Sequence, residues 1–149
     1  MNDEKQLRVD AWEALLHAHA AIVPRIAAAM EATTGLPLTW YDVLLQLYRS
    51  DGNKLRMQDL GAQVVLSRSR VSRIVDELAN AGYVDKQRDP SDGRGTLAVL
   101  TTEGRRVFRK AAPIHLELIE RYVGCLSTTQ ATTIRAGLNT ITEGAEAKP

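Results

Sequence analysis

Residues 66–84 read LSRSRVSRIVDELANAGYV, and this stretch decides the fold that we expect. Three arginines fall within six residues, from Arg68 to Arg73, with serines between them and no acidic residue. The sign of the charge then reverses at Asp76 and Glu77. Because the 149-residue chain has a formal net charge of only +1, its bulk charge gives no argument for a nucleic-acid partner. Any such argument must come from the local placement of the charges.

Helical periodicity gives this stretch one buried face. An apolar stripe with the spacing i, i+3, i+4 and i+7 is formed by Val71, Ile74, Val75 and Leu78. Ser67 can cap the start of a helix, and Gly82 can end it in the left-handed conformation. We therefore predict a helix over residues 67–81 that buries this stripe.

The opposite face of the same helix carries the positive charge. A step of about 100° per residue points Ser69 and Arg73 away from the stripe. Arginine suits the O6/N7 edge of guanine and phosphate, serine can donate to either, and a helix N-terminus also favours phosphate. The alternative is a solvated basic helix face, which is the usual meaning of a charge run. The residues predicted to contact the major groove are Ser67, Arg68, Ser69, Arg70, Ser72 and Arg73.

The rest of the chain is organised around this helix. Apolar periodicity and turn signals predict further helices over residues 5–33, 39–49, 57–65, 101–126 and 127–141. Thr39 and Thr101 are predicted caps, and Pro24 and Pro113 should kink or interrupt their helices. Two short strands, at 83–88 and 96–100, flank the loop DPSDGRG. The expected fold is therefore mainly α, a winged helix-turn-helix with a small β-hairpin wing and long flanking helices.

The hairpin loop carries a further arginine at its tip. Arg94 on a thin loop can reach a minor groove, where narrow width concentrates negative potential. Asp92 can brace it. The alternative is an ordinary turn with an incidental arginine.

Residues 66–104 resemble the MarR family of bacterial transcriptional regulators. The family's wing pattern is Asp-x-Arg followed by a strand and LTxxG, and it is present here as Asp92, Gly93 and Arg94 followed by LAVLTTEG. The likeness includes LTWYDVLLQLYR upstream and extends to the terminal helices. Many relatives carry a second arginine where this chain has Gly93, which should soften contact by the wing.

The resemblance implies an obligate homodimer built on one MarR-type domain over residues 1–149. Residues 36–100 would be the DNA-binding lobe, and 1–35 and 101–149 would be interleaved dimerisation helices. Two recognition helices related by a two-fold axis should read a palindromic site with half-sites about one turn apart. The candidates for the dimer interface are Leu7, Leu126, Ile134, Leu138 and Ile141.

The resemblance also implies a small-molecule effector bound between the dimerisation helices and the winged lobe. A urate-responsive subgroup resembles this chain at Trp12, Asp42 and Arg73, and Lys86 stands where that subgroup usually has arginine. Tryptophan can stack on a planar ligand and arginine can pair with its anionic group, while Asp42 would compete for Arg73. His19 follows Trp12 on the same face and could line the pocket. The alternative reading is a core aromatic, a core or interface histidine and a helix-start acid favoured by the dipole.

Other classes of function find little support. Three histidines and one cysteine give no metal-ligand spacing, and we expect no metal, no cofactor and no enzymatic constellation. No apolar run is long enough to span a bilayer, and the polar N-terminus does not read as a signal peptide, so we expect a cytoplasmic protein. Cys125 is expected to be a buried, inert thiol, and a peroxide sensor is the alternative.

We therefore expect a DNA-binding repressor released from palindromic operators by a small anionic or aromatic ligand. The first alternative is a ligand-independent or redox-responsive regulator acting through Cys125. The second is a winged-helix module that binds protein, but such a module has no need of outward arginines on both helix and wing.

Overall fold

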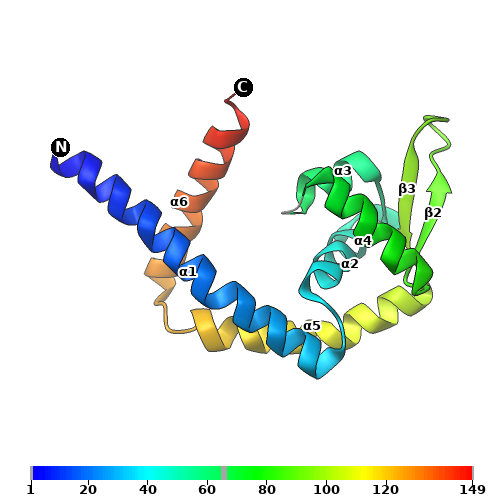
Figure 1. Cartoon of the computed structure of the whole chain (residues 1–149), viewed down its shortest axis with the longest axis horizontal. Coiled ribbons are helices and arrows are strands. Elements are labelled where there is room, and N and C mark those ends of the chain that lie inside the picture. Colours follow the sequence, from blue (N-terminus) through cyan, green and yellow to red (C-terminus); the bar gives the residue numbers. More distant parts are fainter. Residues whose placement is uncertain (1, 65–66, 149) are drawn as a thin grey trace. The chain divides into compact units, whose positions relative to one another are not determined.

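The computed structural model describes residues 2–64 and 67–148, and the side chain of Arg68 lies outside what it describes (Figure 1). The chain divides into two compact units, Met1–His115 and Leu116–Pro149. Within the described ranges, none of the helices is both long and apolar enough to cross a membrane. The predicted boundaries at residues 36 and 100 do not coincide with this division and stay predictions.

The secondary structure is mainly helical, as predicted. The helices are α1 (Asp3–Thr34), α2 (Leu38–Arg49), α3 (Met57–Gln63), α4 (Arg68–Asn80), α5 (Thr102–Val123) and α6 (Thr128–Glu146), with a 3-10 turn η1 (Asp51–Asn53). The strands are β1 (Lys54–Arg56), β2 (Val84–Arg88) and β3 (Thr96–Leu100). The predicted end of the third helix at residue 65 lies outside the described residues.

The core of the first unit forms where α2 and α3 pack against α4. The predicted apolar stripe of α4 is buried, with exposed fractions of 1% for Val71 and 0% for Leu78. Val43, Leu44 and Leu47 of α2 are completely buried. The helix that carries the arginine run is therefore seated on its apolar face, which leaves its polar face outward.

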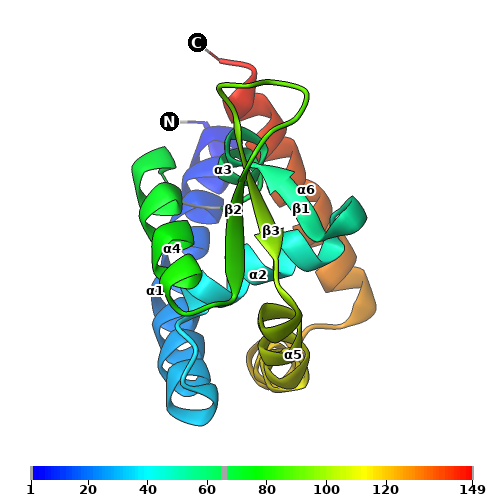
Figure 2. The ribbon, with the colours of Figure 1, turned by 90° about the vertical axis from the view of Figure 1, so that its right-hand side faces the viewer.

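The small sheet is antiparallel with the strand order β1-β3-β2 (Figure 2). The predicted hairpin is confirmed, with Val84 opposite Leu100 and Arg88 opposite Thr96. Strand β1 was not predicted, because three residues between a turn and a helix have too little alternation to identify a strand. It pairs with β3 and places Arg56 beside the hairpin.

Three predicted helix ends are confirmed. The Ser67 hydroxyl accepts a hydrogen bond from the backbone N–H of Arg70 at 3.4 Å. The Thr101 hydroxyl accepts one from the N–H of Gly104 at 3.0 Å. Gly82 follows α4 with a φ of 81°, which is the left-handed conformation expected after a helix.

One predicted helix start was wrong. Thr39 does not cap α2, because the helix begins at Leu38 directly after Pro37, whose ring already restricts φ to −55°. Pro24 and Pro113 were expected to kink or interrupt their helices, and neither interrupts its helix. Proline removes one backbone hydrogen bond and can bend a helix without ending it, so the kink stays a prediction.

Gly104 allows the first turn of α5 to approach the segment before β2 closely. A Cβ at Gly104 would overlap the backbone oxygen of Tyr83 and crowd the side chain of Leu100. The same oxygen accepts a hydrogen bond from the N–H of Thr101 at 3.1 Å. The glycine of the LTxxG pattern is therefore required by packing.

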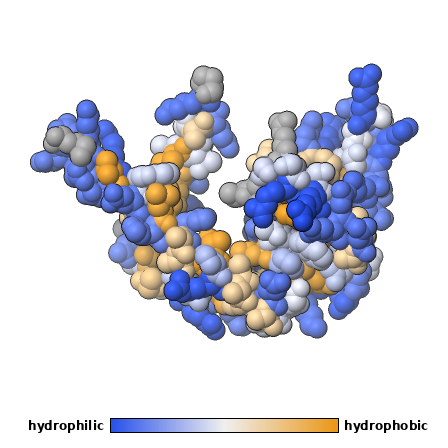
Figure 3. Space-filling model, in the orientation of Figure 1, coloured by the Kyte–Doolittle hydropathy of each residue, from blue (hydrophilic) through white to orange (hydrophobic). Residues whose placement is uncertain are grey.

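The second unit contains the end of α5 and all of α6. A capping box between Ser127 and Gln130 starts α6, which continues five residues beyond its predicted end at 141. Figure 3 shows hydrophobic side chains along α6. Ile134, Leu138 and Ile141 are exposed in the single chain, with exposed fractions of 46%, 37% and 56%.

Candidate nucleic-acid interface

The outward face of α4 has the composition that the periodicity predicted. Ser69, Arg70, Ser72 and Arg73 are all exposed, whereas Val71 between them is buried. The hydroxyl of Ser67 lies 3.3 Å from that of Ser69 and is also engaged in capping the helix. The predicted contact of Arg68 falls on a side chain outside the described part of the chain. The first two turns of α4 thus present two guanidinium groups and several hydroxyls to solvent.

Arg73 is paired, but only weakly. Its Nε lies 3.3 Å from Oε1 of Glu77, one turn along the same helix, and its side chain is 82% exposed. Oε2 of Glu77 accepts a hydrogen bond from Nε1 of Trp40 on α2 at 3.0 Å. The carboxylate beside Arg73 is therefore Glu77 and not Asp42. An exposed pair of this kind contributes about 0.3–0.5 kcal/mol, so Arg73 can leave it at little cost.

A second ion pair joins α4 to the wing. Nζ of Lys86 on β2 lies 2.6 Å from Oδ1 of Asp76 on α4. Asp76 therefore holds the lysine of the hairpin and not an arginine of its own helix. This exposed contact links the first strand of the wing to the helix that carries the arginine run.

Arg94 lies at the exposed tip of the wing, as predicted. Oδ1 of Asp92 accepts a hydrogen bond from the backbone N–H of Arg94 at 3.1 Å, and its carbonyl accepts one from the N–H of Gly95 at 2.9 Å. Asp92 therefore braces the backbone of the tip and leaves the guanidinium of Arg94 free to extend.

The base of the wing contains a cluster that the sequence analysis missed. Asp89 is only 3% exposed, and its Oδ2 lies 2.7 Å from Nε of Arg56 on β1. Its Oδ1 accepts hydrogen bonds from the backbone N–H and the hydroxyl of Ser91, at 2.9 and 2.8 Å. Nη2 of Arg56 donates to the same hydroxyl at 2.7 Å. The hydrogen bonds from Ser91 and the charge of Arg56 hold the pKa of Asp89 below its usual range.

We call Arg56, Asp89 and Ser91 the wing clamp. The signal in the sequence was an aspartate followed by Pro-Ser at the end of a strand, which is typical of a turn stabilised by its own side chain. Its partner Arg56 could not be found without β1, because the two residues lie far apart in the sequence.

The residues predicted to bind a ligand lie on α1, α2, α4 and β2. Trp12 is 56% exposed on α1, so it is not a core aromatic of this chain, and His19 is exposed. Asp42 is half-buried on α2, and burial raises its pKa to about 6. Arg73 and Lys86 are engaged in the ion pairs described above. The predicted pocket stays a prediction.

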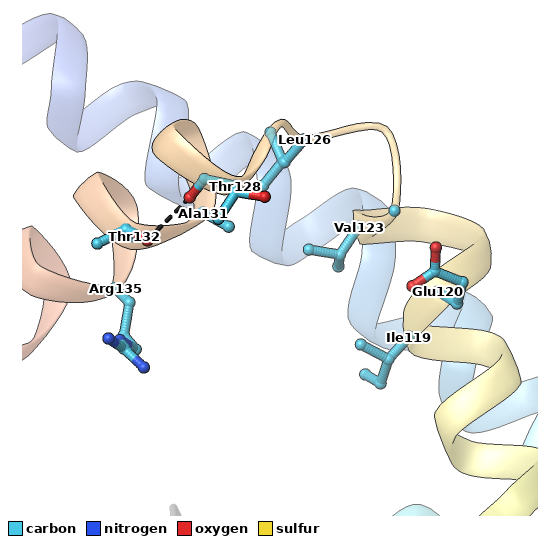
Figure 4. A pocket seen from close by; sticks show the side chains of 9 residues that line it. Ile119, Glu120, Val123, Leu126, Thr128, Ala131, Thr132 and Arg135 are labelled. Carbon is cyan, nitrogen blue, oxygen red and sulfur yellow. Dashed lines mark hydrogen bonds between the residues drawn. The ribbon is translucent and has the colours of Figure 1, made fainter.

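In the second unit, a cavity of about 410 Å³ lies between the end of α5 and the start of α6 (Figure 4). Ile119, Val123 and Leu126 give it an apolar side. Glu120 and Arg135 supply the charges, and the hydroxyl of Thr132 donates to the carbonyl of Thr128 at 2.8 Å. Leu126, a predicted interface residue, is half-buried here.

Cys125 is exposed, so its interpretation as a buried thiol was wrong. The residue follows the last turn of α5, where its Sγ donates only to the carbonyl of Tyr122 at 3.8 Å. Over residues 2–64 and 67–148, no group of three or more histidine, cysteine, aspartate or glutamate side chains could hold a metal ion.

Comparison with known proteins places these features in a family. The MarR family profile matches residues 34–95. The crystal structure of Sco3205, a MarR family transcriptional regulator from Streptomyces coelicolor in complex with DNA, superposes with a TM-score of 0.86 at 30% identity, covering 97% of this chain and 89% of that one. AbsC, a MarR family regulator from the same organism, gives a TM-score of 0.87 at 29% identity over 99% and 98% of the two chains.

A curated relative agrees with these structures. The uncharacterised HTH-type transcriptional regulator YkoM of Bacillus subtilis is 33% identical over 93 residues, which are 62% of this chain. The match spans 59% of the length of YkoM.

Proposed function

The chain belongs to the MarR family of transcriptional regulators, not to a family of enzymes, and we propose that it binds a palindromic DNA operator as a homodimer. The observation that carries this proposal is the pairing of two exposed basic elements in one compact unit. Arg70 and Arg73 face outward from the first two turns of α4, and Arg94 extends from a braced wing. Sco3205, the similar protein solved with DNA, supports a partner of this kind.

In the proposed complex, the N-terminal turns of α4 enter the major groove and Arg94 reaches the adjacent minor groove. Ser67, Arg68, Ser69 and Ser72 complete the set of major-groove contacts. Because chromosomal DNA is the partner, the protein would act in the cytoplasm at the nucleoid. A dimer that occupies an operator excludes other proteins from it, and the output that we propose is therefore repression.

The proposed dimer is supported by exposed apolar side chains at both ends of the chain. Leu7 on α1 is 68% exposed, and Ile134, Leu138 and Ile141 follow one face of α6. With Leu126 they form the proposed interface between two copies. A two-fold axis then sets the two α4 helices on successive major grooves.

Release by a small anionic or aromatic ligand is the regulatory part of the proposal. Trp12, His19, Asp42, Arg73 and Lys86 are the residues proposed for its pocket. The weak pair between Arg73 and Glu77 supports a switch of this kind, because little free energy is needed to move Arg73 between partners.

The proposal is tested by selecting the operator from random DNA and titrating the dimer against the selected duplex. The selected site should be palindromic, and its affinity should fall steeply as salt rises, because phosphate contacts release counterions. A selection without palindromic sites, or an affinity that is flat with salt, would contradict the docking that we describe.

The exposure of Cys125 favours one alternative, a regulator that responds to oxidants. Peroxide treatment of the protein–operator complex separates the two. Ligand control predicts that peroxide leaves binding unchanged in both wild type and Cys125→Ser. Redox control predicts release of the wild type only.

A further inference from the structure

The wing carries a second exposed arginine besides Arg94. This is Arg88, the last residue of β2. Both arginines line a hollow of about 360 Å³ on the hairpin of β2 and β3, which Figure 2 shows end to end. Thr96, which stands opposite Arg88 in the hairpin, lines it as well. We call this the wing hollow.

The neck of the loop sets the two arginines at different positions along the wing. The backbone N–H of Asp89 donates to the carbonyl of Gly95 at 2.9 Å, which closes the loop. Arg88 comes one residue before this closing pair, on the strand, whereas Arg94 comes one residue beyond it, within the loop. Arg94 therefore extends from the tip, and Arg88 is set back from it at the end of β2.

Strand alternation places Arg88 on the side of β2 that is linked to α4. Side chains two residues apart along a strand point to the same face. Lys86, two residues before Arg88, reaches Asp76 of α4, with Nζ and Oδ1 2.6 Å apart. Arg88 thus projects from the same face of the strand as a side chain that contacts the helix with the arginine run.

The wing hollow is positively charged, and the acids of the loop do not neutralise it. Its lining includes two arginines, one lysine and no carboxylate. Asp89 is engaged in the wing clamp, and Asp92 accepts from the backbone N–H of Arg94. In the part of the chain that the structure describes, neither Arg88 nor Arg94 forms an ion pair. A concave surface lined by charges of one sign attracts ions of the opposite sign.

Glycine keeps one side of the hollow open. A Cβ built on Gly93 would meet no described atom within 4 Å, so the space beside Arg94 is free. Because glycine has no side chain, the backbone of a large ligand can approach the loop closely at this point. A DNA duplex offers rows of anionic phosphates, and arginine pairs with phosphate through two parallel N–H···O bonds.

We propose that the wing hollow receives a phosphate of the operator backbone, held by Arg88, while Arg94 extends past it into the minor groove. This contact rests on the DNA binding proposed above and adds to it. Because Arg88 is set back from the tip, it meets the rim of the groove, where the phosphates lie, and not the base edges within it. The hydroxyl of Thr96 can donate to the same phosphate. Arg88 therefore contributes affinity and register but no base preference.

Arg88→Gln tests the contact through the salt dependence of operator binding. Each lost phosphate contact should reduce the steepness of log affinity against log salt by about 0.9, and the dimer, with two wings, should lose about twice that value. Affinity should fall about fivefold, because an exposed ion pair is weak and two are lost. The preferred operator sequence should stay the same. Arg109→Gln on α5 removes the same charge outside the hollow, and this matched control should keep the wild-type slope.

Ethylation interference identifies the phosphate. An ethyl group on a phosphate removes its charge, so ethylation at the rim of the minor groove that receives the wing should interfere with binding of the wild type in each half-site. This interference should be absent for Arg88→Gln. Arg88→Lys keeps the charge and should retain it.

A rescue variant separates a phosphate contact from a structural role. Gly93→Arg places a new cation in the free space beside Arg94. In the Arg88→Gln background it should recover most of the lost affinity and salt dependence, which it could not do if Arg88 only supported the strand. Loss of affinity without a change of slope, or failure of Gly93→Arg to rescue, would overturn the contact.

The two proposals fail in different ways. A wild type that binds no selected operator contradicts the proposed function, and the phosphate contact with it. A wild type that binds its operator with a steep salt dependence, which Arg88→Gln shares in full, overturns the contact of Arg88 alone.

Discussion

Helix α4 and the wing present arginines by opposite means. On α4 the backbone is rigid because its apolar face is buried, and Arg73 is then left 82% exposed in a weak pair with Glu77. The wing has no buried face at its tip, and its geometry depends on side chains: Asp92 at the turn and the wing clamp, with Asp89 only 3% exposed. A helix can leave its contact residues free, whereas a loop needs dedicated residues to hold them in place.

The strongest test of this comparison is Arg94→Ala. A hydrogen bond to a charged group is worth about 1.5–3 kcal/mol. Loss of this contact from each wing should therefore lower the operator affinity of the protein roughly tenfold or more. The dimer should stay intact, and Arg109→Ala on α5 serves as the control. Gel-shift titration measures the change, and an unchanged affinity would remove the wing from the interface.

Asp89→Asn tests whether the clamp acts through Arg94. Loss of the charge that pairs with Arg56 should loosen the wing and weaken operator binding up to about tenfold, which corresponds to the upper end of the net value of one hydrogen bond, about 1.5 kcal/mol. In the Arg94→Ala background the same substitution should change affinity by less than about twofold, because there is no arginine left to position. Additive losses in the double mutant would show that Asp89 supports the fold in general and not the wing arginine.

Helix α4 packs against α2, so its rigidity depends on the stability of α2. The pH dependence of stability tests the contribution of Asp42 on α2. Burial raises the folded-state pKa of Asp42 to about 6, so between about pH 4 and 6 the folded chain keeps a proton that the unfolded chain has released. Stability therefore falls as pH rises through this window. Asp42→Asn should remove this dependence and stabilise the chain at pH 7 by about 1 kcal/mol, after a reduction for partial exposure.

Chemical denaturation at several pH values measures this effect as the difference between wild type and Asp42→Asn. Wild type must be compared with Asp42→Asn because His115 changes the stability with pH in the opposite direction. Burial lowers the pKa of His115, so its contribution rises with pH up to about 6.5. A constant difference between the two proteins from pH 4 to 7 would contradict the assignment to Asp42.

The smallest expected effect is that of Glu77→Gln. Glutamine keeps an acceptor for Trp40 but removes the charge beside Arg73, and an exposed helical pair is worth about 0.3–0.5 kcal/mol. Operator affinity should change by less than about threefold, and the preferred operator sequence should stay the same. A large loss would mean that Arg73 depends on its partner as closely as the wing depends on its clamp.

The features that the sequence predicted correctly are local. The two faces of α4, the Ser67 cap and the hairpin follow from spacings within one turn or one loop. The features it missed join residues far apart, as Arg56 joins Asp89 and Trp40 joins Glu77. No periodicity records such pairs, since they depend on how α2 and β1 are packed. Exposure of a single residue, as at Cys125, likewise depends on neighbours that a local pattern does not name.

Gly104 has a mechanical consequence. No side chain fits between Gly104 and the carbonyl of Tyr83. The first turn of α5 is therefore in direct contact with the start of the hairpin. A rotation of the first turn of α5 about the helix axis should therefore also move the start of β2. A methyl group added at position 104 would push α5 away from Tyr83. Movements of α5 would then no longer be transmitted to the wing.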